Sequence, residues 1–180
     1  MAIRPGTHTL GPQDGELLVH TRRSGAAAKA GHDLVIEVGS WSGTLEIPDD
    51  PGQSSVAVHA EGDSLRVREG SGGIQALGEG DKDDIKETID KEVLRGGAIE
   101  FRSTAVQADP DGERLHVRGG LELVGRTGPV EFELRLAEGR LTGAATVKQS
   151  DWGIKPYSAL FGALKVADEV VVTIDAGVAG

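Results

Sequence analysis

The chain has 180 residues, a formal net charge of −10, 27 glycines and no cysteine. Its length fits one domain, because a single hydrophobic core can serve roughly 200 residues. The acidic balance argues against nucleic acid or an anionic membrane surface as a partner, since both repel a negatively charged protein. The lack of cysteine excludes a disulfide framework and thiolate chemistry.

The N-terminal residues from Met1 to Gly6 do not contain the apolar segment of a secretory signal. No later run stays apolar for the ~20 residues that a membrane-spanning helix needs. We therefore expect a cytoplasmic protein without a transmembrane segment.

Short strands are predicted in the N-terminal third from alternating apolar and polar residues. The short apolar run 17–21 is one, and alternation covers residues 34–38 and 56–60. Each of these segments predicts a half-buried strand. The glycine-rich stretch 70–80 resembles a phosphate loop only superficially, since no Gly-Lys-Ser/Thr ending follows it, and we expect a loop that leads into a helix.

One helix interrupts the strands near residues 81–95. Ile85, Ile89 and Val93 recur every four residues, which gives an amphipathic face. Aspartates crowd its start, where they complement the positive end of the helix dipole, and two glycines follow its end. A second, short helical turn is expected near 156–162, where Pro156 leads an apolar segment.

The clearest alternation lies in the C-terminal half. Residues 115–123 and 130–136 each present aliphatic or aromatic side chains on one face and mainly charged ones on the other. Turn residues at 109–112 and 138–139 predict hairpins between adjacent antiparallel strands. The segment 170–174 predicts a last strand that closes the sheet.

Three of these segments resemble, in order, the C-terminal half of the YceI-like family: Phe101 to Thr104, Val117 to Val130 and Ser150 to Ile154. Two departures occur. Trp152 stands where the family usually has Phe in its Asp-Phe-Gly-Ile motif, and Asp83-Asp84 stands where relatives carry an Arg-Asp pair.

The resemblance implies a mainly β chain folded over residues 1–180 as one antiparallel, lipocalin-like β-barrel of about eight strands. Such a barrel is wide enough to hold side chains or one small ligand. Because aromatic residues are few, we expect a cavity lined by Val, Leu, Ile and Ala. The family implies that a polyisoprenoid or another long-chain apolar lipid occupies it, without a cofactor. Relatives also make a homodimer plausible.

Candidate ligand contacts follow from the inward-facing positions and from the resemblance. His32 lies in Gly31 to Ile36, which is similar to a family segment, but a structural hydrogen bond is an alternative role for it. Trp41 and Trp152 are either ligand contacts or packed core residues. Tyr157 and Phe161 form either an apolar gate or a simple cover for the barrel end. The expected set is His32, Leu34, Ile36, Trp41, Phe101, Leu121, Phe132, Leu134, Trp152, Tyr157 and Phe161.

Catalytic and metal motifs are missing from the sequence. The five histidines lack metal-ligand spacing, and no Gly-x-Ser-x-Gly elbow is found. We therefore expect non-covalent binding. Two alternatives stay open: an isomerase- or hydrolase-like enzyme that uses a polar pocket of the same barrel, and a stress-related interaction protein without lipid. A buried carboxylate pair would favour the enzyme, and a filled barrel would favour the interaction protein.

Overall fold

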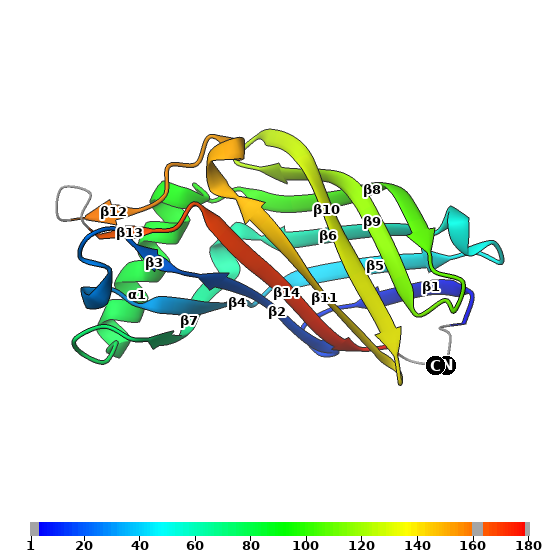
Figure 1. The fold of residues 1–180 in the computed structure, drawn as a ribbon, viewed down its shortest axis with the longest axis horizontal. Helices are drawn as coiled ribbons and strands as arrows, with labels where there is room; N and C mark the ends of the chain where they lie inside the picture. The colour runs from blue at the N-terminus through cyan, green and yellow to red at the C-terminus, as the bar shows by residue number, and fades with distance from the viewer. Residues whose placement is uncertain (1–3, 160–163, 179–180) are drawn as a thin grey trace.

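The computed structural model describes residues 4–159 and 164–178, which form a curled antiparallel sheet with one helix at its side (Figure 1). The sheet has eleven strands in the order β1-β5-β6-β8-β9-β10-β11-β14-β2-β4-β7. Their bounds are β1 Gly6–Leu10, β2 Gly15–Thr21, β4 Asp33–Val38, β5 Trp41–Ile47, β6 Ser55–Glu61, β7 Leu65–Ser71, β8 Ala98–Ala108, β9 Arg114–Leu123, β10 Arg126–Ala137, β11 Arg140–Lys148 and β14 Glu169–Gly177.

The hydrogen-bonded pairs show that these strands close into a barrel of eight longer, bent strands. β1 and β2 follow each other in the chain, as do β4 and β5, and β6 and β7. β1 pairs with β5 while β2 pairs with β4, and β5 pairs with β6 while β4 pairs with β7. The three bent strands and β8 to β11 and β14 make eight. Because β14 pairs with β2, the circuit closes, in agreement with the sequence-based strand number.

A small second sheet covers one end of this barrel. It consists of β12 (Ser158–Ala159), β13 (Leu164–Val166) and β3 (Arg23–Ser24), in the order β12-β13-β3. The helical turn expected near 156–162 is therefore wrong for residues 158 and 159, which are extended and pair with Leu164 and Lys165. A strand pair satisfies their backbone groups without the tertiary contacts that an isolated helical turn would need. Residues 160–162 of the expected turn lie outside the described part of the chain.

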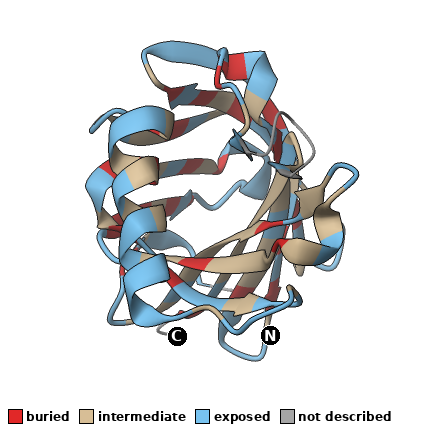
Figure 2. Cartoon of the chain, turned by 90° about the vertical axis from the view of Figure 1, so that its left-hand side faces the viewer, coloured by how far each residue is buried: buried red, intermediate tan, exposed pale blue. Residues whose placement is uncertain are grey.

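Helix α1 spans Glu79–Thr88 and continues as a π-helical turn, η4, over Ile89–Val93. The helix expected near 81–95 is confirmed, with an earlier start. That start is explained by Asp81, whose carboxylate accepts a hydrogen bond of 2.9 Å from the backbone N–H of Gly78. The helix packs against β7, and its outer face is exposed (Figure 2).

Four short 3-10 turns complete the described structure: η1 Ala28–Ala30, η2 Pro51–Gln53, η3 Gly62–Ser64 and η5 Gln149–Trp152. The two expected hairpins are confirmed. At the tighter one, between β10 and β11, Glu138 and Gly139 both have positive φ angles of 53° and 73°. This is the twist that a two-residue hairpin loop requires.

The core confirms the alternation seen in the sequence. Every apolar residue at the odd positions 115–123 of β9 is buried, and the charged residues between them are exposed. One face of the sheet therefore points into the barrel. Within the interior, the end formed by the last residues of β8, β10 and β14 is packed solid by Val106, Leu115, Val117, Leu136 and Ala176.

Candidate functional site

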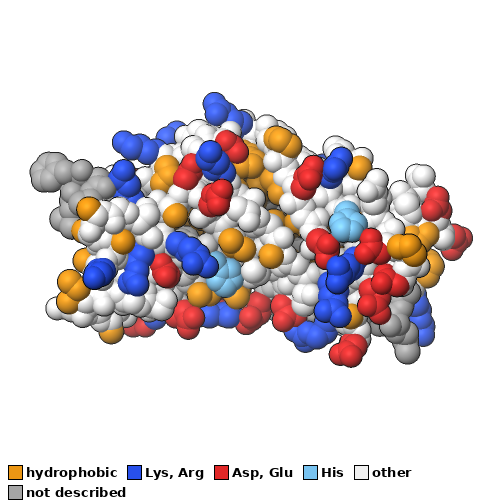
Figure 3. Space-filling view, in the orientation of Figure 1, with side chains coloured by type: hydrophobic (Ala, Val, Ile, Leu, Met, Phe, Trp, Pro, Cys, Tyr) orange, Lys and Arg blue, Asp and Glu red, His pale blue; other side chains and the backbone are white. Residues whose placement is uncertain are grey.

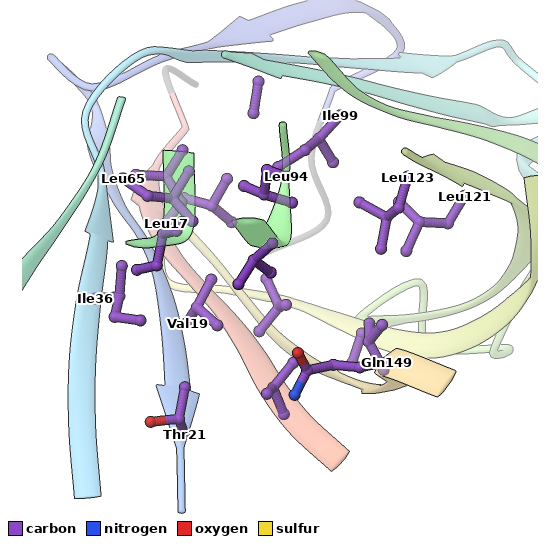
Figure 4. Close-up of a pocket in the computed structure, with 18 of the residues that line it drawn as sticks. Leu17, Val19, Thr21, Ile36, Leu65, Leu94, Ile99, Leu121, Leu123 and Gln149 are labelled. Atoms are coloured by element: carbon purple, nitrogen blue, oxygen red, sulfur yellow. The ribbon is translucent and has the colours of Figure 1, made fainter. Parts of the chain in front are cut away.

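The other part of the barrel interior is hollow. A cavity of about 550 Å³ lies between the strands of the barrel and the helix α1 with η4. Its volume falls within the roughly 300–1,000 Å³ typical of small-molecule pockets. Figure 4 shows aliphatic side chains from several strands and from the helical segment pointing toward this common space. They include Leu17, Val19, Ile36, Leu65, Leu94, Ile99, Leu121 and Leu123.

The choice of side chains explains why this space is not filled. Inward positions in the lining hold mostly Val, Leu, Ile and Ala, and among the described residues two phenylalanines contribute. Phe101 and Phe132 lie with their ring centroids 5.1 Å apart and tilted by 59°. Gly119 makes room for this pair, because a Cβ there would lie 2.6 Å from the Phe101 ring. The Phe101 ring therefore lies directly over Gly119 of β9.

Polar groups gather where the cavity reaches β3, β13 and η5, which we call the mouth. The His32 ring bonds through Nε2 to the Gln75 carbonyl at 2.7 Å, and Arg23 Nη1 donates to the Gly31 carbonyl at 2.8 Å. Gln149 Nε2 donates to the Ala167 carbonyl at 3.1 Å. The mouth is thus held together by side chains that also line the cavity.

The hydroxyl of Thr21 is unusual among the lining groups. Thr21 is 9% exposed, and its Oγ1 is buried without a hydrogen-bond partner in the part of the chain that the structure describes. An unsatisfied buried hydroxyl costs about 1–3 kcal/mol. A polar group of a ligand at this end of the cavity would remove that cost.

Most of the residues selected from the sequence lie around this cavity. His32, Leu34, Ile36, Phe101, Leu121, Phe132, Leu134 and Tyr157 all line it. His32 also makes the structural hydrogen bond that was its alternative role. Phe161 lies outside the described residues.

The two tryptophans are not part of the lining. Trp41 is 5% exposed and packs in the core where β5 pairs with β6. Trp152 is 4% exposed, and its Nε1 donates a 2.7 Å hydrogen bond to the buried carbonyl of Leu121. The structure therefore gives both rings the packing role that the sequence left open.

Sequence reasoning missed the polar residues at the mouth, namely Thr21, Arg23, Gln149 and Lys165. No local sequence pattern identifies these residues as lining a cavity, because each lies at the end of a short strand or in a turn. Only Gln149 had a neighbouring signal, since it directly precedes the Ser150 to Ile154 segment. Their grouping depends on the pairing of β13 with β3, across more than 140 residues of sequence.

Carboxylates are scarce in the cavity. Among the described residues the lining contains one, Asp84, and its side chain belongs to an exposed residue of α1. No group of three or more His, Asp or Glu side chains in residues 4–159 and 164–178 is arranged to hold a metal ion. None of the described helices is long and apolar enough to cross a membrane.

An antiparallel barrel that encloses an apolar cavity defines the class of ligand-binding β-barrels. Within that class, the model of the YceI-like domain matches residues 19–178, and the chain belongs to this family. No curated protein sequence is significantly similar to it.

Two solved structures share the fold. BcnA from Burkholderia cenocepacia superimposes with a TM-score of 0.63 at 17% identity, over 92% of this chain and 96% of that one. A mutant CJ YceI protein, solved with a monobromobimane guest, gives a TM-score of 0.57 at 10% identity. That match covers 81% of this chain and 84% of the other. Both similarities establish the architecture.

Proposed function

We propose that the protein binds a long apolar ligand, a polyisoprenoid or a similar lipid, by burying it in the barrel cavity without a covalent step. The observation that carries this proposal is the hollow, aliphatic interior of about 550 Å³ beside an otherwise tightly packed core. Membership of the YceI-like family supports the same function.

The physical source of affinity is the hydrophobic effect. Each methylene group removed from water contributes about 0.8 kcal/mol, so roughly ten buried methylenes contribute about 8 kcal/mol before the cost of association. The cavity wall offers aliphatic side chains from every part of the barrel circuit, so selectivity rests on shape and length more than on polar contacts. A prenyl chain meets these requirements, and the Thr21 hydroxyl and Gln149 amide suit one polar group near its end.

The enzyme alternative is less favoured by the lining. Acid–base catalysis needs a titratable pair whose environment separates the two pKa values. The single lining carboxylate, Asp84, belongs to an exposed residue and has no second carboxylate beside it among the described lining residues. A filled barrel would have favoured the interaction-protein alternative, and the hollow interior does not supply that support.

A cavity-filling substitution tests the proposal. Val172 on β14 lines the cavity, and its neighbour Val171 points to the opposite face of the sheet. Val172→Trp should reduce uptake of a tritium-labelled polyprenol at least tenfold, because the indole occupies the space that the chain needs. Val171→Trp is the matched control, with the same change in residue size, and should bind like the parent protein.

Thermal unfolding separates blocked binding from misfolding. Filling a void often stabilises a protein by about 0.5–2 kcal/mol, so the melting temperature of Val172→Trp should be unchanged or higher. Equal polyprenol uptake by both variants and the parent would contradict binding inside the barrel. Absence of uptake by the parent protein would remove the proposal.

A further inference from the structure

The charge around the cavity mouth differs from the charge of the whole protein. The segments 22–32 and 152–167 contain Arg22, Arg23, Lys29, Lys155 and Lys165 and not one Asp or Glu, although the chain carries 29 acidic residues and a net charge of −10. The local balance at these segments is therefore positive, with five cations and no carboxylate, although Asp33, Asp151 and Asp168 border them.

The two segments form one continuous border of the mouth. β13 pairs with β3 through Lys165 opposite Ser24, and the Ala167 N–H donates to the Arg22 carbonyl at 2.7 Å. Turn η1, which carries Lys29, contacts both of these strands. We call this unit the basic rim: residues 22–32, 152–159 and 164–167. Lys and Arg side chains are prominent at this end of the molecule in Figure 3.

The cations of the basic rim are available to a partner. Arg22, Lys29, Lys155 and Lys165 are exposed, and none of them forms an ion pair with a described residue. Arg23 alone has an acidic neighbour, Asp33, at 3.9 Å. Elsewhere in the described chain arginines are often paired, as Arg68 is with Glu16 and Glu37.

Exposed apolar side chains occur at the same end. Ile74 is 81% exposed and Tyr157 is 48% exposed, and these are the large hydrophobic residues of the described chain that protrude most into water. Tyr157 belongs to the basic rim and lines the cavity. Ile74 follows Gly72 and Gly73, which lie so close to Arg23 and His32 that a Cβ would clash with them. Both apolar side chains therefore flank the mouth.

The opposite side of the mouth has the reverse charge. Helix α1 carries Glu79, Asp81, Asp83 and Asp84 in its first two turns. It lies on one side of the barrel opening in the view along the barrel (Figure 2). An anionic surface would attract the basic rim and repel this helix, so the charges also select an orientation.

We infer that the basic rim docks on an anionic phospholipid bilayer, with Ile74 and Tyr157 entering the interface, so that the cavity opens toward the membrane. The inference rests on the proposed function and adds the surface from which the apolar ligand is drawn or to which it is delivered. Juxtaposed cations and apolar side chains are the combination that interfacial binding needs. The net charge of −10 argues against such a partner for the protein as a whole. It does not apply to the basic rim, because the charge of this surface is locally positive.

Vesicle flotation tests the inference. The ligand-free protein should float with vesicles of phosphatidylglycerol and phosphatidylcholine, should stay behind with phosphatidylcholine alone, and should be released by salt as the charges are screened. The double variant Lys29→Glu/Lys155→Glu should lose about 25-fold or more in partitioning, because the loss of each cation costs roughly fivefold. Neither residue lines the cavity.

The matched control reverses two exposed arginines on the outer wall. Arg102 on β8 and Arg135 on β10 lie outside the basic rim, and Arg102→Glu/Arg135→Glu changes the net charge by the same amount. It should partition within about twofold of the parent. Equal losses in the two double variants would show a general charge effect and overturn the inference, as would equal binding to neutral and anionic vesicles.

Uptake of polyprenol from detergent-free solution, without vesicles, separates the two proposals. Lys29→Glu/Lys155→Glu should keep this uptake and lose only transfer from anionic vesicles. If the parent takes up polyprenol but does not float, docking fails and ligand binding stands. If the parent floats but takes up no polyprenol, the proposed function fails. Docking on the bilayer would then stand, but exchange of an apolar ligand at the membrane would be overturned.

Discussion

The two ends of the barrel interior are lined by the same types of aliphatic residue. They differ in packing, because side chains fill the interior at one end and leave a cavity at the other. At the closed end, Val117, Leu136 and Ala176 are fully buried, with exposed fractions between 0% and 2%. In the part of the barrel around the cavity, which we call the open end, Leu17, Val19 and Val172 remain partly buried. The closed end therefore supplies rigidity and the open end supplies space for one small ligand, which an eight-stranded barrel is wide enough to hold.

The largest expected contrast comes from the same truncation at the two ends. Leu136→Ala should lower the free energy of unfolding by about 2–5 kcal/mol, because it opens a void in a close-packed region. Leu17→Ala should cost clearly less, about 1–2 kcal/mol, because the side chain already lacks neighbours on its cavity side. Urea denaturation of both variants measures the difference. Equal costs would mean that the open end is packed as tightly as the closed one.

A smaller effect is expected where β8 and β9 approach each other closely at Gly119. A Cβ at Gly119 would lie 2.2 Å from the Arg102 carbonyl oxygen, so Gly119→Ala should destabilise by about 1–3 kcal/mol. At Gly80, on the helix beside the open end, a Cβ meets nothing within 4 Å. Gly80→Ala should be neutral or stabilise by up to about 1 kcal/mol. A higher melting temperature for Gly119→Ala would contradict the close approach of β8 and β9.

The smallest expected effect is on the pKa of His59, which lies on the outer wall of the barrel, away from the closed end and from the open end. Hydrogen bonds that the His59 ring donates to the carboxylates of Glu61 and, to a smaller extent, Glu100 raise the pKa of His59 above its usual value. The protonated ring is thus favoured in the folded state, so its contribution to stability is present below about pH 6.5 and is lost as the pH rises through the raised pKa.

Glu61→Gln should lower the pKa of His59 in an NMR titration, because it removes the larger of the two contributions. Polyprenol uptake and vesicle binding should be the same in this variant as in the parent. An unchanged His59 titration would show that the contact at 2.9 Å is not maintained in solution.

Much of the fold could be predicted because the signals were local. The alternation in 115–123 and 130–136 fixed which side chains face inward, and the acidic start with a four-residue apolar repeat identified the helix. The extended conformation of Ser158 and Ala159 was missed, since it depends on pairing with β13 rather than on their own preference. Trp41 and Trp152 could not be assigned from sequence, because core and cavity positions share the same apolar character.

Sequence by itself determined the strand periodicity, the helix, the family resemblance and the aliphatic composition of the interior. Only the tertiary structure decided where that interior stays empty, because a void depends on how side chains from distant strands meet. It also decided the charge of the mouth, since the pairing of β3 with β13 brings together cations from residues 22–29 and 155–165. A net charge is a sum over the chain, whereas a partner experiences only the surface that faces it.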